Sequence, residues 1–570
     1  MKNKKCIDLF TEEGEKLLKN EWNVYPRPMM KRDSFFCLNG DWEFYEQDGV
    51  CETIIVPYPP ESLLSGINRG IRSEYILYRK SFSLPKEFIK DRVILHFGGV
   101  DQIAEVEING HFLGKHIGGY DPFSFDITEY LCDENILCVS VTNDKDPYAL
   151  PYGKQRKKRG GMWYTEVTGI WQTVWLESVP NAYIKAIDTN ISDNHVTINV
   201  IGVKKGTVTV ETENGSMAIP INNGEASFDI SEPHMWSPED PYLYRFSVES
   251  GDDKVESYFA FRTLSVCDVN GIPRLCLNGK PYFFHGLLDQ GYFSDGIFTP
   301  ATPKGYEQDI LSMKSLGFNM LRKHIKIEPE QFYYDCDRLG MIVFQDMVNN
   351  GKYSFLRDTA LPTVGLKRMP DRIMHLNKKS RQAFVDGMEK TVAALKNHPC
   401  ICYWTIFNEG WGQFCSDEMY ERLRALDPTR FIDSTSGWFR QKKSDVESIH
   451  VYFKPVKMPK KSLRPIVLSE FGGYSYKPEG HVYNPYKTYG YRFFKEQRDF
   501  ENSLDGLYRD EIIPAISKGL CATVYTQLSD VEDETNGLVS YDRKILKIDK
   551  KRAQSFSAAL FEEFSKCIIE

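Results

Sequence analysis

The sequence contains no long hydrophobic run. Its apolar stretches fall short of the roughly 18 residues that a membrane-spanning helix needs. The N-terminal segment is interrupted by Asp8, Glu12, Glu13 and Glu15, so it lacks the apolar centre of a signal peptide. We therefore expect a cytoplasmic protein with no membrane partner.

The sequence also lacks a positive charge excess and paired cysteines. It has 71 Lys and Arg residues against 79 Asp and Glu residues, a formal net charge of −8. That balance excludes the strongly basic surface typical of nucleic-acid-binding proteins. The 13 cysteines are scattered, apart from Cys400 and Cys402, and form no Cys-x-x-Cys pair of the kind found in zinc sites. We expect buried free thiols and no nucleic-acid partner.

The N-terminal half of the sequence predicts two β-sandwiches. Residues 35–177 alternate apolar and polar residues in short runs, and Asn109-Gly110 supplies the positive φ angles of a tight hairpin turn. A second stretch of short strands, residues 182–266, has the length of an immunoglobulin-like sandwich.

After Asn270-Gly271, apolar runs of strand length alternate with amphipathic runs of helix length, which is typical of a parallel sheet with covering helices. One helix is expected to begin with Thr302 as its N-cap and Pro303 as its first residue, and to stop at Gly317. Another should span residues 329–339 and stop at Gly340. The predicted strands are residues 282–286, 318–324, 341–346, 401–408, 431–436, 449–453, 466–470 and 523–527. Eight such units predict a (β/α)8 barrel.

Polar side chains stand where these predicted strands end. They are Arg322, His324, Gln345, Asp346, Asn408, Glu409, His450, Tyr452, Glu470, Gln527 and Asp530. In a (β/α)8 barrel the carboxyl ends of the strands meet at one mouth, which carries the active site. We therefore expect these side chains to converge.

Two of these residues, Glu409 and Glu470, form a candidate catalytic pair. Paired carboxylates in one pocket hydrolyse glycosides, with one carboxyl protonated to donate to the leaving oxygen and the other ionised to attack the anomeric carbon. The plain alternative is that each is an ordinary ion-paired glutamate at a strand end.

Two segments, residues 396–409 (KNHPCICYWTIFNE) and 169–177 (GIWQTVWLE), resemble glycoside hydrolase family 2, which includes β-galactosidases, β-glucuronidases and β-mannosidases. The resemblance implies a jelly-roll sugar-binding-type sandwich, an immunoglobulin-like sandwich and a catalytic barrel. The expected domains are residues 1–180, 181–268 and 269–570. It further implies a retaining exo-β-glycosidase that needs no metal or cofactor.

The resemblance also implies roles for individual residues. Glu409 would be the general acid/base and Glu470 the nucleophile, with Asn408 bonding the sugar 2-hydroxyl and Tyr452 orienting the nucleophile. The remaining substrate-binding candidates are Asp346, Arg322, His324, Trp411, His450 and Gln527. Arg322 and His324 depart from the family pattern, because the usual Arg-x-x-His-Tyr-Pro is shortened here.

A second departure bears on the sugar. β-Glucuronidases carry Asn-x-Lys after strand 8 to hold the uronate carboxylate, whereas this chain has Asn536-Gly-Leu538 there. This departure disfavours a glucuronide. A β-galactosidase is our first choice because that activity is frequent in the family, and a β-glucuronidase, galacturonidase or β-mannosidase is the alternative. The basic residues 154–159 could still contact an acidic sugar or form a solvated loop. Trp163 could reach the barrel mouth or pack internally.

Two other classes of function stay open. A catalytically silent carbohydrate-binding protein could keep the same domains, although it would not need both glutamates. A metal-dependent barrel hydrolase would have to use His324, Asp346 and His450, which show no ligand spacing. The expected partner is a carbohydrate substrate, and a homo-oligomer is compatible with the sequence.

Overall fold

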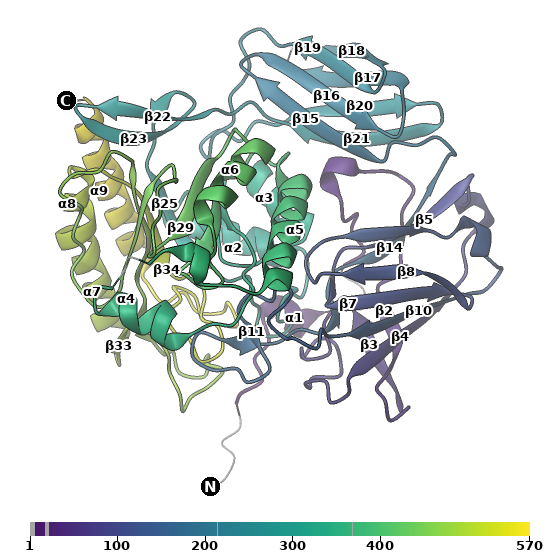
Figure 1. Ribbon diagram of the computed structural model, residues 1–570, viewed down its shortest axis with the longest axis horizontal. Coiled ribbons are helices and arrows are strands. Elements are labelled where there is room, and N and C mark those ends of the chain that lie inside the picture. Colours follow the sequence, from purple (N-terminus) through teal and green to yellow (C-terminus); the bar gives the residue numbers. More distant parts are fainter. Residues whose placement is uncertain (1–5, 18–21, 214, 367–368, 570) are drawn as a thin grey trace.

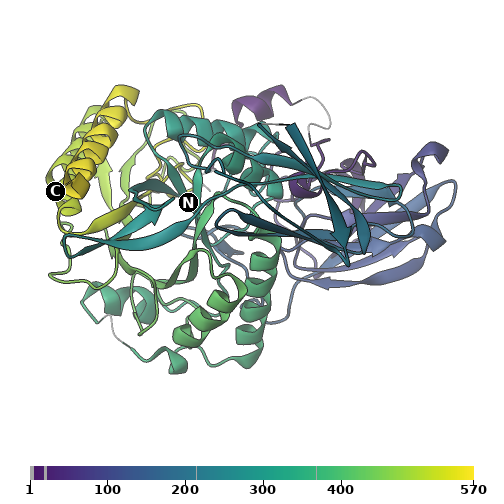
Figure 2. The same cartoon turned by 90° about the horizontal axis from the view of Figure 1, so that it is seen from above.

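The computed structural model describes residues 6–17, 22–213, 215–366 and 369–569. It contains three units (Figure 1), and both β-sandwiches lie on one side of the barrel (Figure 2). Within the described residues, no helix is long and apolar enough to cross a membrane. The fold class predicted from the sequence is confirmed.

The N-terminal sandwich consists mainly of a six-stranded sheet, in the order β3-β2-β4-β10-β7-β8, and a four-stranded sheet, in the order β1-β14-β5-β9. These strands are β1 (Phe36–Cys37), β2 (Gly40–Tyr45), β3 (Cys51–Val56), β4 (Tyr75–Phe82), β5 (Arg92–Phe97), β7 (Ile103–Ile108), β8 (His111–Ile117), β9 (Phe123–Asp126), β10 (Asn135–Thr142) and β14 (Val174–Val179). Asn109 and Gly110 have φ angles of 52° and 80° between β7 and β8, so the predicted hairpin is confirmed.

The second sandwich joins its strands in the order β15-β16-β19-β18-β17-β20-β21 around a separate apolar core. They are β15 (Ala186–Ser192), β16 (His195–Ile201), β17 (Lys205–Thr212), β18 (Gly215–Asn222), β19 (Glu225–Asp229), β20 (Tyr244–Ser250) and β21 (Asp253–Phe259). Arg32 links the two sandwiches, because its guanidinium lies 2.9 Å from Glu177 and 3.0 Å from Asp253. A three-stranded sheet of β22 (Leu264–Val269), β23 (Ile272–Leu277) and β24 (Lys280–Pro281) leads to the barrel.

Eight parallel strands form the barrel, in the order β29-β28-β27-β26-β25-β34-β31-β30. They are β25 (Phe284–Asp289), β26 (Met320–Lys323), β27 (Ile342–Asp346), β28 (Ile401–Asn408), β29 (Phe431–Ser436), β30 (Glu447–Val451), β31 (Ile466–Gly472) and β34 (Leu520–Thr526). Each of the eight predicted strands is present. The bounds of β28 and β29 are as predicted, and those of the other six differ by up to three residues at either end. The end strands β29 and β30 are linked by a side-chain contact, in which the Ser436 hydroxyl lies 3.0 Å from His450 Nε2.

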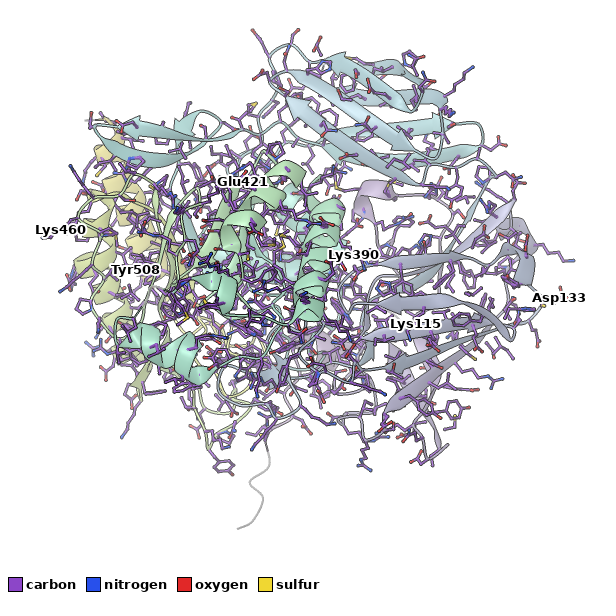
Figure 3. All side chains as sticks on the ribbon, viewed as in Figure 1. Lys115, Asp133, Lys390, Glu421, Lys460 and Tyr508 are labelled. Atoms are coloured by element: carbon purple, nitrogen blue, oxygen red, sulfur yellow. The ribbon has the colours of Figure 1, made fainter. Side chains whose placement is uncertain are left out.

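Helices cover the outside of the barrel. They include α2 (Lys304–Ser315), α3 (Glu330–Leu339), α5 (Lys378–Leu395), α6 (Ser416–Leu426), α7 (Gln497–Leu507), α8 (Ile513–Ile516) and α9 (Lys550–Ile569). Helix α5 carries Lys390, which is labelled in Figure 3, and also contacts the N-terminal sandwich. Lys390 Nζ donates to Asp121 Oδ2 at 2.7 Å.

The expected N-cap of the first barrel helix is wrong. Helix α2 has Pro303 at its N-cap position, and the Thr302 hydroxyl is buried without a hydrogen-bond partner. The main chain makes the turn instead, because Gly305 donates to the Thr302 carbonyl at 3.0 Å. Helix α3 does end at Gly340, whose φ of 70° requires the left-handed conformation that glycine favours.

A long loop of the N-terminal sandwich, residues 143–173, reaches the barrel. It carries the paired strands β11 (Gln155–Arg156) and β12 (Tyr164–Thr165). The Tyr152 amide donates to the Asn349 carbonyl at 3.1 Å, and the Thr165 amide donates to Glu532 Oε1 at 2.9 Å. The N-terminal domain therefore meets the loops that follow β27 and β34.

Candidate active site

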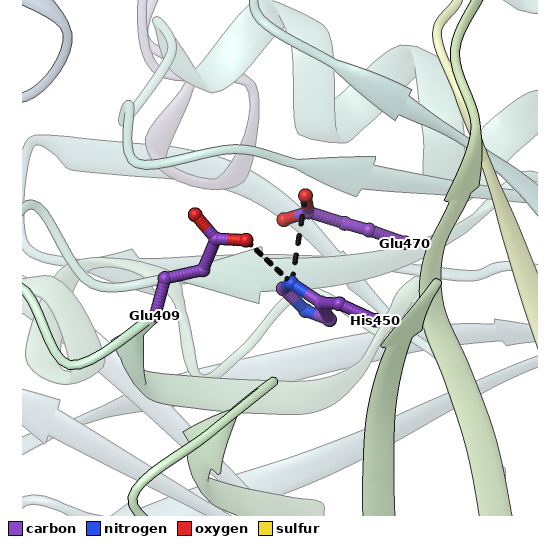
Figure 4. A group of neighbouring side chains, drawn as sticks. All are labelled: Glu409, His450 and Glu470. Atoms are coloured by element: carbon purple, nitrogen blue, oxygen red, sulfur yellow. Dashed lines mark hydrogen bonds and ion pairs between the residues drawn. The ribbon is translucent and has the colours of Figure 1, made fainter. Parts of the chain in front are cut away.

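Two glutamates and a histidine face one another at the carboxyl ends of the barrel strands (Figure 4). His450 Nδ1 lies 2.9 Å from Glu409 Oε1 and 3.6 Å from Glu470 Oε2. One ligand atom of each of these three residues lies within 4.8 Å of the others. The carboxylates thus approach the spacing of about 5–5.5 Å found in retaining glycosidases, and not the about 6.5–9.5 Å of inverting ones.

Glu470 is held as an anion. Arg322 donates to its Oε1 at 3.2 Å, and the Tyr452 hydroxyl donates to its Oε2 at 2.5 Å. Burial raises the pKa of Glu470, but His450, Arg322, His324 and Tyr452 outweigh that effect and hold the pKa at about 2. An ionised carboxylate is the form that a nucleophile requires.

Arg322 connects several of the residues that the sequence singled out. Its guanidinium also donates to Asp346 Oδ1 at 3.0 Å and to Asn408 Oδ1 at 2.9 Å. His324 Nδ1 lies 2.7 Å from Asp346 Oδ2, so Asp346 has protein partners on both oxygens. This arrangement leaves the Asn408 NH2 group, and not its oxygen, to meet a substrate.

Glu409 has a different environment from Glu470. Its side chain is 19% exposed against 6% for Glu470, and its main chain has a φ of 54°. Within the described parts of the chain, no lysine or arginine nitrogen lies within 4.0 Å of its carboxylate. The two carboxylates are therefore placed in unequal surroundings, as acid/base and nucleophile roles require.

Not every predicted substrate-binding residue faces the carboxylates. Gln527 is fully buried and bonds Gln290 and Asn536, while Asp530 pairs with Lys547 at 2.7 Å. Gln527 therefore supports neighbouring side chains, and Asp530 belongs to a buried ion pair.

Aromatic side chains line one side of the mouth. Trp411 is 3% exposed, and its Nε1 donates to the Gly351 carbonyl at 2.9 Å. Trp163, from the sandwich loop, packs edge-on against Trp411 with ring centroids 5.1 Å apart. Arg156 lies 3.6 Å above the Trp163 ring. Trp163 thus both packs internally and brings the N-terminal sandwich to the barrel mouth.

The sequence-based reasoning missed several residues near the carboxylates. Trp438 Nε1 donates to the Glu409 carbonyl at 3.0 Å, and Tyr491 stacks on Tyr452 at 3.7 Å. Burial and, to a smaller extent, the charge of Glu470 raise the pKa of Glu534, on the loop after β34. These residues lie in loops beyond the strand ends, where no periodic pattern of apolar residues predicts their position. The acidic residues within 530–534 are the one sequence feature that indicated this loop.

Three sequence profiles of one family match the chain. The "Glycosyl hydrolases family 2, sugar binding domain" matches residues 37–180, "Glycosyl hydrolases family 2" matches residues 176–262, and "Glycosyl hydrolases family 2, TIM barrel domain" matches residues 269–496. Each profile matches one of the three units of the fold, and the barrel profile ends before β34.

Curated relatives differ in the sugar they are named for. A β-galactosidase of Thermoanaerobacter pseudethanolicus is 26% identical over 380 residues, covering 62% of this chain and 47% of the relative. A putative β-glucuronidase of Formosa agariphila is 28% identical over 390 residues, covering 63% of this chain and 34% of the relative. The matched region spans at most about half the length of these two relatives.

Solved structures share the whole fold. A β-D-glucuronidase from Dictyoglomus thermophilum aligns with a TM-score of 0.73 and 18% identity, covering 94% of this chain and 98% of that one. A β-galacturonidase from Eisenbergiella tayi bound to galacturonate aligns with a TM-score of 0.66 and 20% identity, with the same coverage. The profiles and the fold agree that the chain belongs to glycoside hydrolase family 2.

Proposed function

We propose that this protein is a retaining exo-β-glycosidase. The observation that carries the proposal is the close pair of carboxylates in unequal surroundings, Glu409 and Glu470, bridged by His450 Nδ1 at 2.9 Å and 3.6 Å. A merely structural pair of glutamates would not need one member held ionised in a buried pocket while the other is more exposed.

The geometry supports a double displacement. Glu470 attacks the anomeric carbon and forms a glycosyl ester, while Glu409 gives its proton to the departing glycosidic oxygen. Glu409 then takes a proton from water, and the hydroxide portion attacks the anomeric carbon and releases Glu470. Arg322 and Tyr452 keep Glu470 ionised and fixed in direction before the attack.

For the sugar, our first choice is a terminal β-galactoside. Most cations near the mouth already have anionic partners: Arg322 has Glu470 and Asp346, Lys323 has Asp289 and Glu328, and Lys547 has Asp530. A uronate carboxylate left without a cation would lose several kcal/mol on burial. The second candidate is a uronide, and Lys154 favours it, because within the described residues no carboxylate lies within 4.0 Å of its ammonium group.

A substrate panel with product analysis tests the proposal. Purified protein is assayed against p-nitrophenyl β-glycosides of galactose, glucose, mannose, glucuronate and galacturonate, and the first product is followed by NMR. We expect hydrolysis with the β-anomer appearing first, and the highest kcat/KM for galactoside. An α-anomer as first product contradicts retention. Sugar binding without any hydrolysis would favour the silent carbohydrate-binding protein.

A further inference from the structure

A cleft of about 400 Å³ lies between the N-terminal sandwich and the barrel. One wall belongs to helix α5, the barrel helix beside the sandwich in Figure 1, and includes Ala383 and Gly387. Other walls include Pro151, from the loop 143–173, and Trp22, which precedes the sandwich. Small-molecule sites have volumes of about 300–1,000 Å³ and mostly apolar walls. The cleft therefore has the size of a site for a small molecule.

The cleft is separate from the catalytic carboxylates. The described residues that line it do not include Glu409, His450 or Glu470. It lies close to the barrel mouth nonetheless, because Val348 lines it and the next residue, Asn349, donates from Nδ2 to the Trp411 carbonyl at 2.7 Å. A molecule in the cleft would thus be bound outside the site where glycosides react.

Three polar groups of the lining have hydrogen-bonding capacity that no described residue uses. Gln172 is 9% exposed, and its side-chain amide has no hydrogen-bond partner within the described chain. Arg27 donates to Glu177 Oε1 at 2.5 Å, but its buried Nε has no partner. The Glu330 carboxylate, in the first turn of α3, likewise has no hydrogen bond or ion pair among the described residues. Since buried polar groups are nearly always hydrogen-bonded, these three groups point to a ligand.

The charges of the lining disfavour an anionic ligand. Arg27 and Lys390 are the basic residues among the described ones that line the cleft, and each already pairs with a carboxylate, at 2.5 Å and 2.7 Å. The acidic residues of the lining are Asp121, Glu328, Glu330 and Asp386. An anion would therefore meet the unpaired Glu330 carboxylate without gaining a free cation.

We propose that this cleft binds a neutral aromatic molecule that carries a hydroxyl group. Trp22, Tyr120 and Trp175 line it, and such rings offer flat apolar surface to a planar ligand. A ligand hydroxyl can donate to the Glu330 carboxylate and accept from the Gln172 amide or from Arg27 Nε. The inference goes beyond the proposed glycosidase activity and does not depend on it.

Direct binding of 2-naphthol, followed by fluorescence titration, tests the proposal. The matched probe is naphthalene-2-carboxylate, which has the same rings and an anionic group in place of the hydroxyl. Burial raises the pKa of Glu330, so both probes are compared at pH 8, well above the ordinary 4.5 of a glutamate.

Two substitutions at one position separate the cleft from every other part of the surface. A Cβ at Gly387 would lie 3.4 Å from Pro151 Cγ, an ordinary contact, so Gly387→Ala should leave the cleft open. The longer side chain in Gly387→Leu should take up its space. Both residues also suit a helix interior better than glycine does.

We expect wild type and Gly387→Ala to bind 2-naphthol with similar Kd, and Gly387→Leu to bind it about tenfold more weakly or worse. Gln172→Leu should lose about 2- to 10-fold, the value of one hydrogen bond. The wild type should bind naphthalene-2-carboxylate about tenfold more weakly than 2-naphthol, and Glu330→Gln should narrow that difference.

Three results would overturn the inference. They are no binding of 2-naphthol, equal Kd values in wild type and Gly387→Leu, which would place the probe at the barrel mouth or elsewhere, and tighter binding of the carboxylate by the wild type. Sedimentation velocity adds a fourth, because dissociation of an oligomer in Gly387→Leu would show that a second copy of the chain occupies the cleft.

A misfolded variant is recognised by thermal unfolding. Saturating 2-naphthol should raise the unfolding temperature of wild type and of Gly387→Ala but not that of Gly387→Leu, because only a bound ligand stabilises the folded state. If Gly387→Leu does not fold, Ala383→Leu decides the question. It lies one turn earlier on the same face of α5 and should abolish the same binding.

Discussion

At the scale of single residues, His450 is the side chain that couples the two carboxylates. Its Nδ1 faces Glu409 and Glu470, while its Nε2 lies 3.0 Å from the Ser436 hydroxyl. Among the groups that lower the pKa of Glu470, His450 has the largest effect. A substitution of His450 should therefore change the pKa of Glu470 more than it changes the packing of the site.

We expect His450→Gln to shift the acid limb of the pH profile of kcat/KM to higher pH. The pKa of Glu470 is about 2 with His450 in place, and removal of this neighbour should raise it by about one unit or more toward the ordinary 4.5. The profile is measured on an activated aryl glycoside, which does not need the acid. Ser436→Ala, which removes the Nε2 partner together with the contacts of Ser436 to the Ser448 and Ser469 hydroxyls but leaves the imidazole in place, is the control. An unmoved acid limb in His450→Gln would contradict the coupling.

Glu409→Gln should slow the hydrolysis of a glycoside more, the more its leaving group depends on protonation. General acid catalysis contributes about 10²- to 10⁴-fold. An alkyl glycoside should lose that factor in turnover, while a dinitrophenyl glycoside should form the glycosyl-enzyme nearly as fast as wild type, because its phenolate leaves unprotonated. Pre-steady-state kinetics on both substrates measure the difference. Equal losses would remove Glu409 from the acid role.

The catalytic glutamates could be predicted from the sequence because each directly follows an apolar strand. Tyr491 and Glu534 could not, since their loops are placed by tertiary contacts. Asp346 and Gln527 were correctly located at strand ends, but their orientation depends on partners, Arg322 and Asn536, that no spacing reveals.

At the scale of elements, the parallel strands were predictable because they are buried on both faces and read as continuous apolar runs. The helix ends were harder to predict. Helix α3 stops at Gly340 as expected, but the start of α2 is formed by a main-chain hydrogen bond and not by the Thr302 hydroxyl. The most consequential element, the loop 143–173, has no regular periodicity, and its position follows from its contacts with the barrel.

Within that loop, Trp163→Ala should weaken both stability and substrate binding. Trp163 is 9% exposed and packs between Arg156 and Trp411. Truncation of a buried Trp costs about 3–5 kcal/mol, and the cavity would leave Trp411 unsupported at the mouth. Thermal unfolding and KM are measured together, with Trp163→Phe as the milder control. Wild-type KM in Trp163→Ala would argue that the loop does not shape the site.

At the scale of the whole molecule, buried acids of the N-terminal sandwich make stability depend on pH. Burial raises the pKa of Glu61 from 4.5 to about 8 and that of Asp101 from 3.8 to about 7. Between the unfolded and folded pKa values, these two carboxyl groups bind more protons in the folded protein than in the unfolded chain, so their contribution to stability is greatest below the unfolded values and falls as pH rises toward 8. Glu470 has a pKa lowered from 4.5 to about 2, so its contribution to stability changes only below pH 4.5.

We therefore expect the unfolding temperature to fall by several degrees between pH 5.5 and pH 8.5. Glu61→Gln should flatten this dependence, because its amide does not titrate in the same environment. Differential scanning calorimetry at matched ionic strength gives the comparison. A wild-type unfolding temperature that rises over this range would mean that Glu61 and Asp101 are not protonated in the folded protein.

The account as a whole depends on Glu470 forming a covalent bond to the sugar. Incubation with the 2-fluoro derivative of the preferred sugar, followed by proteolysis and mass spectrometry, measures this directly. We predict one glycosyl group per chain, on the peptide containing Glu470, and none in Glu470→Gln. Labelling of Glu409 or any other residue, or hydrolysis that proceeds with no trapped intermediate, would contradict the assignment of Glu470 as the nucleophile.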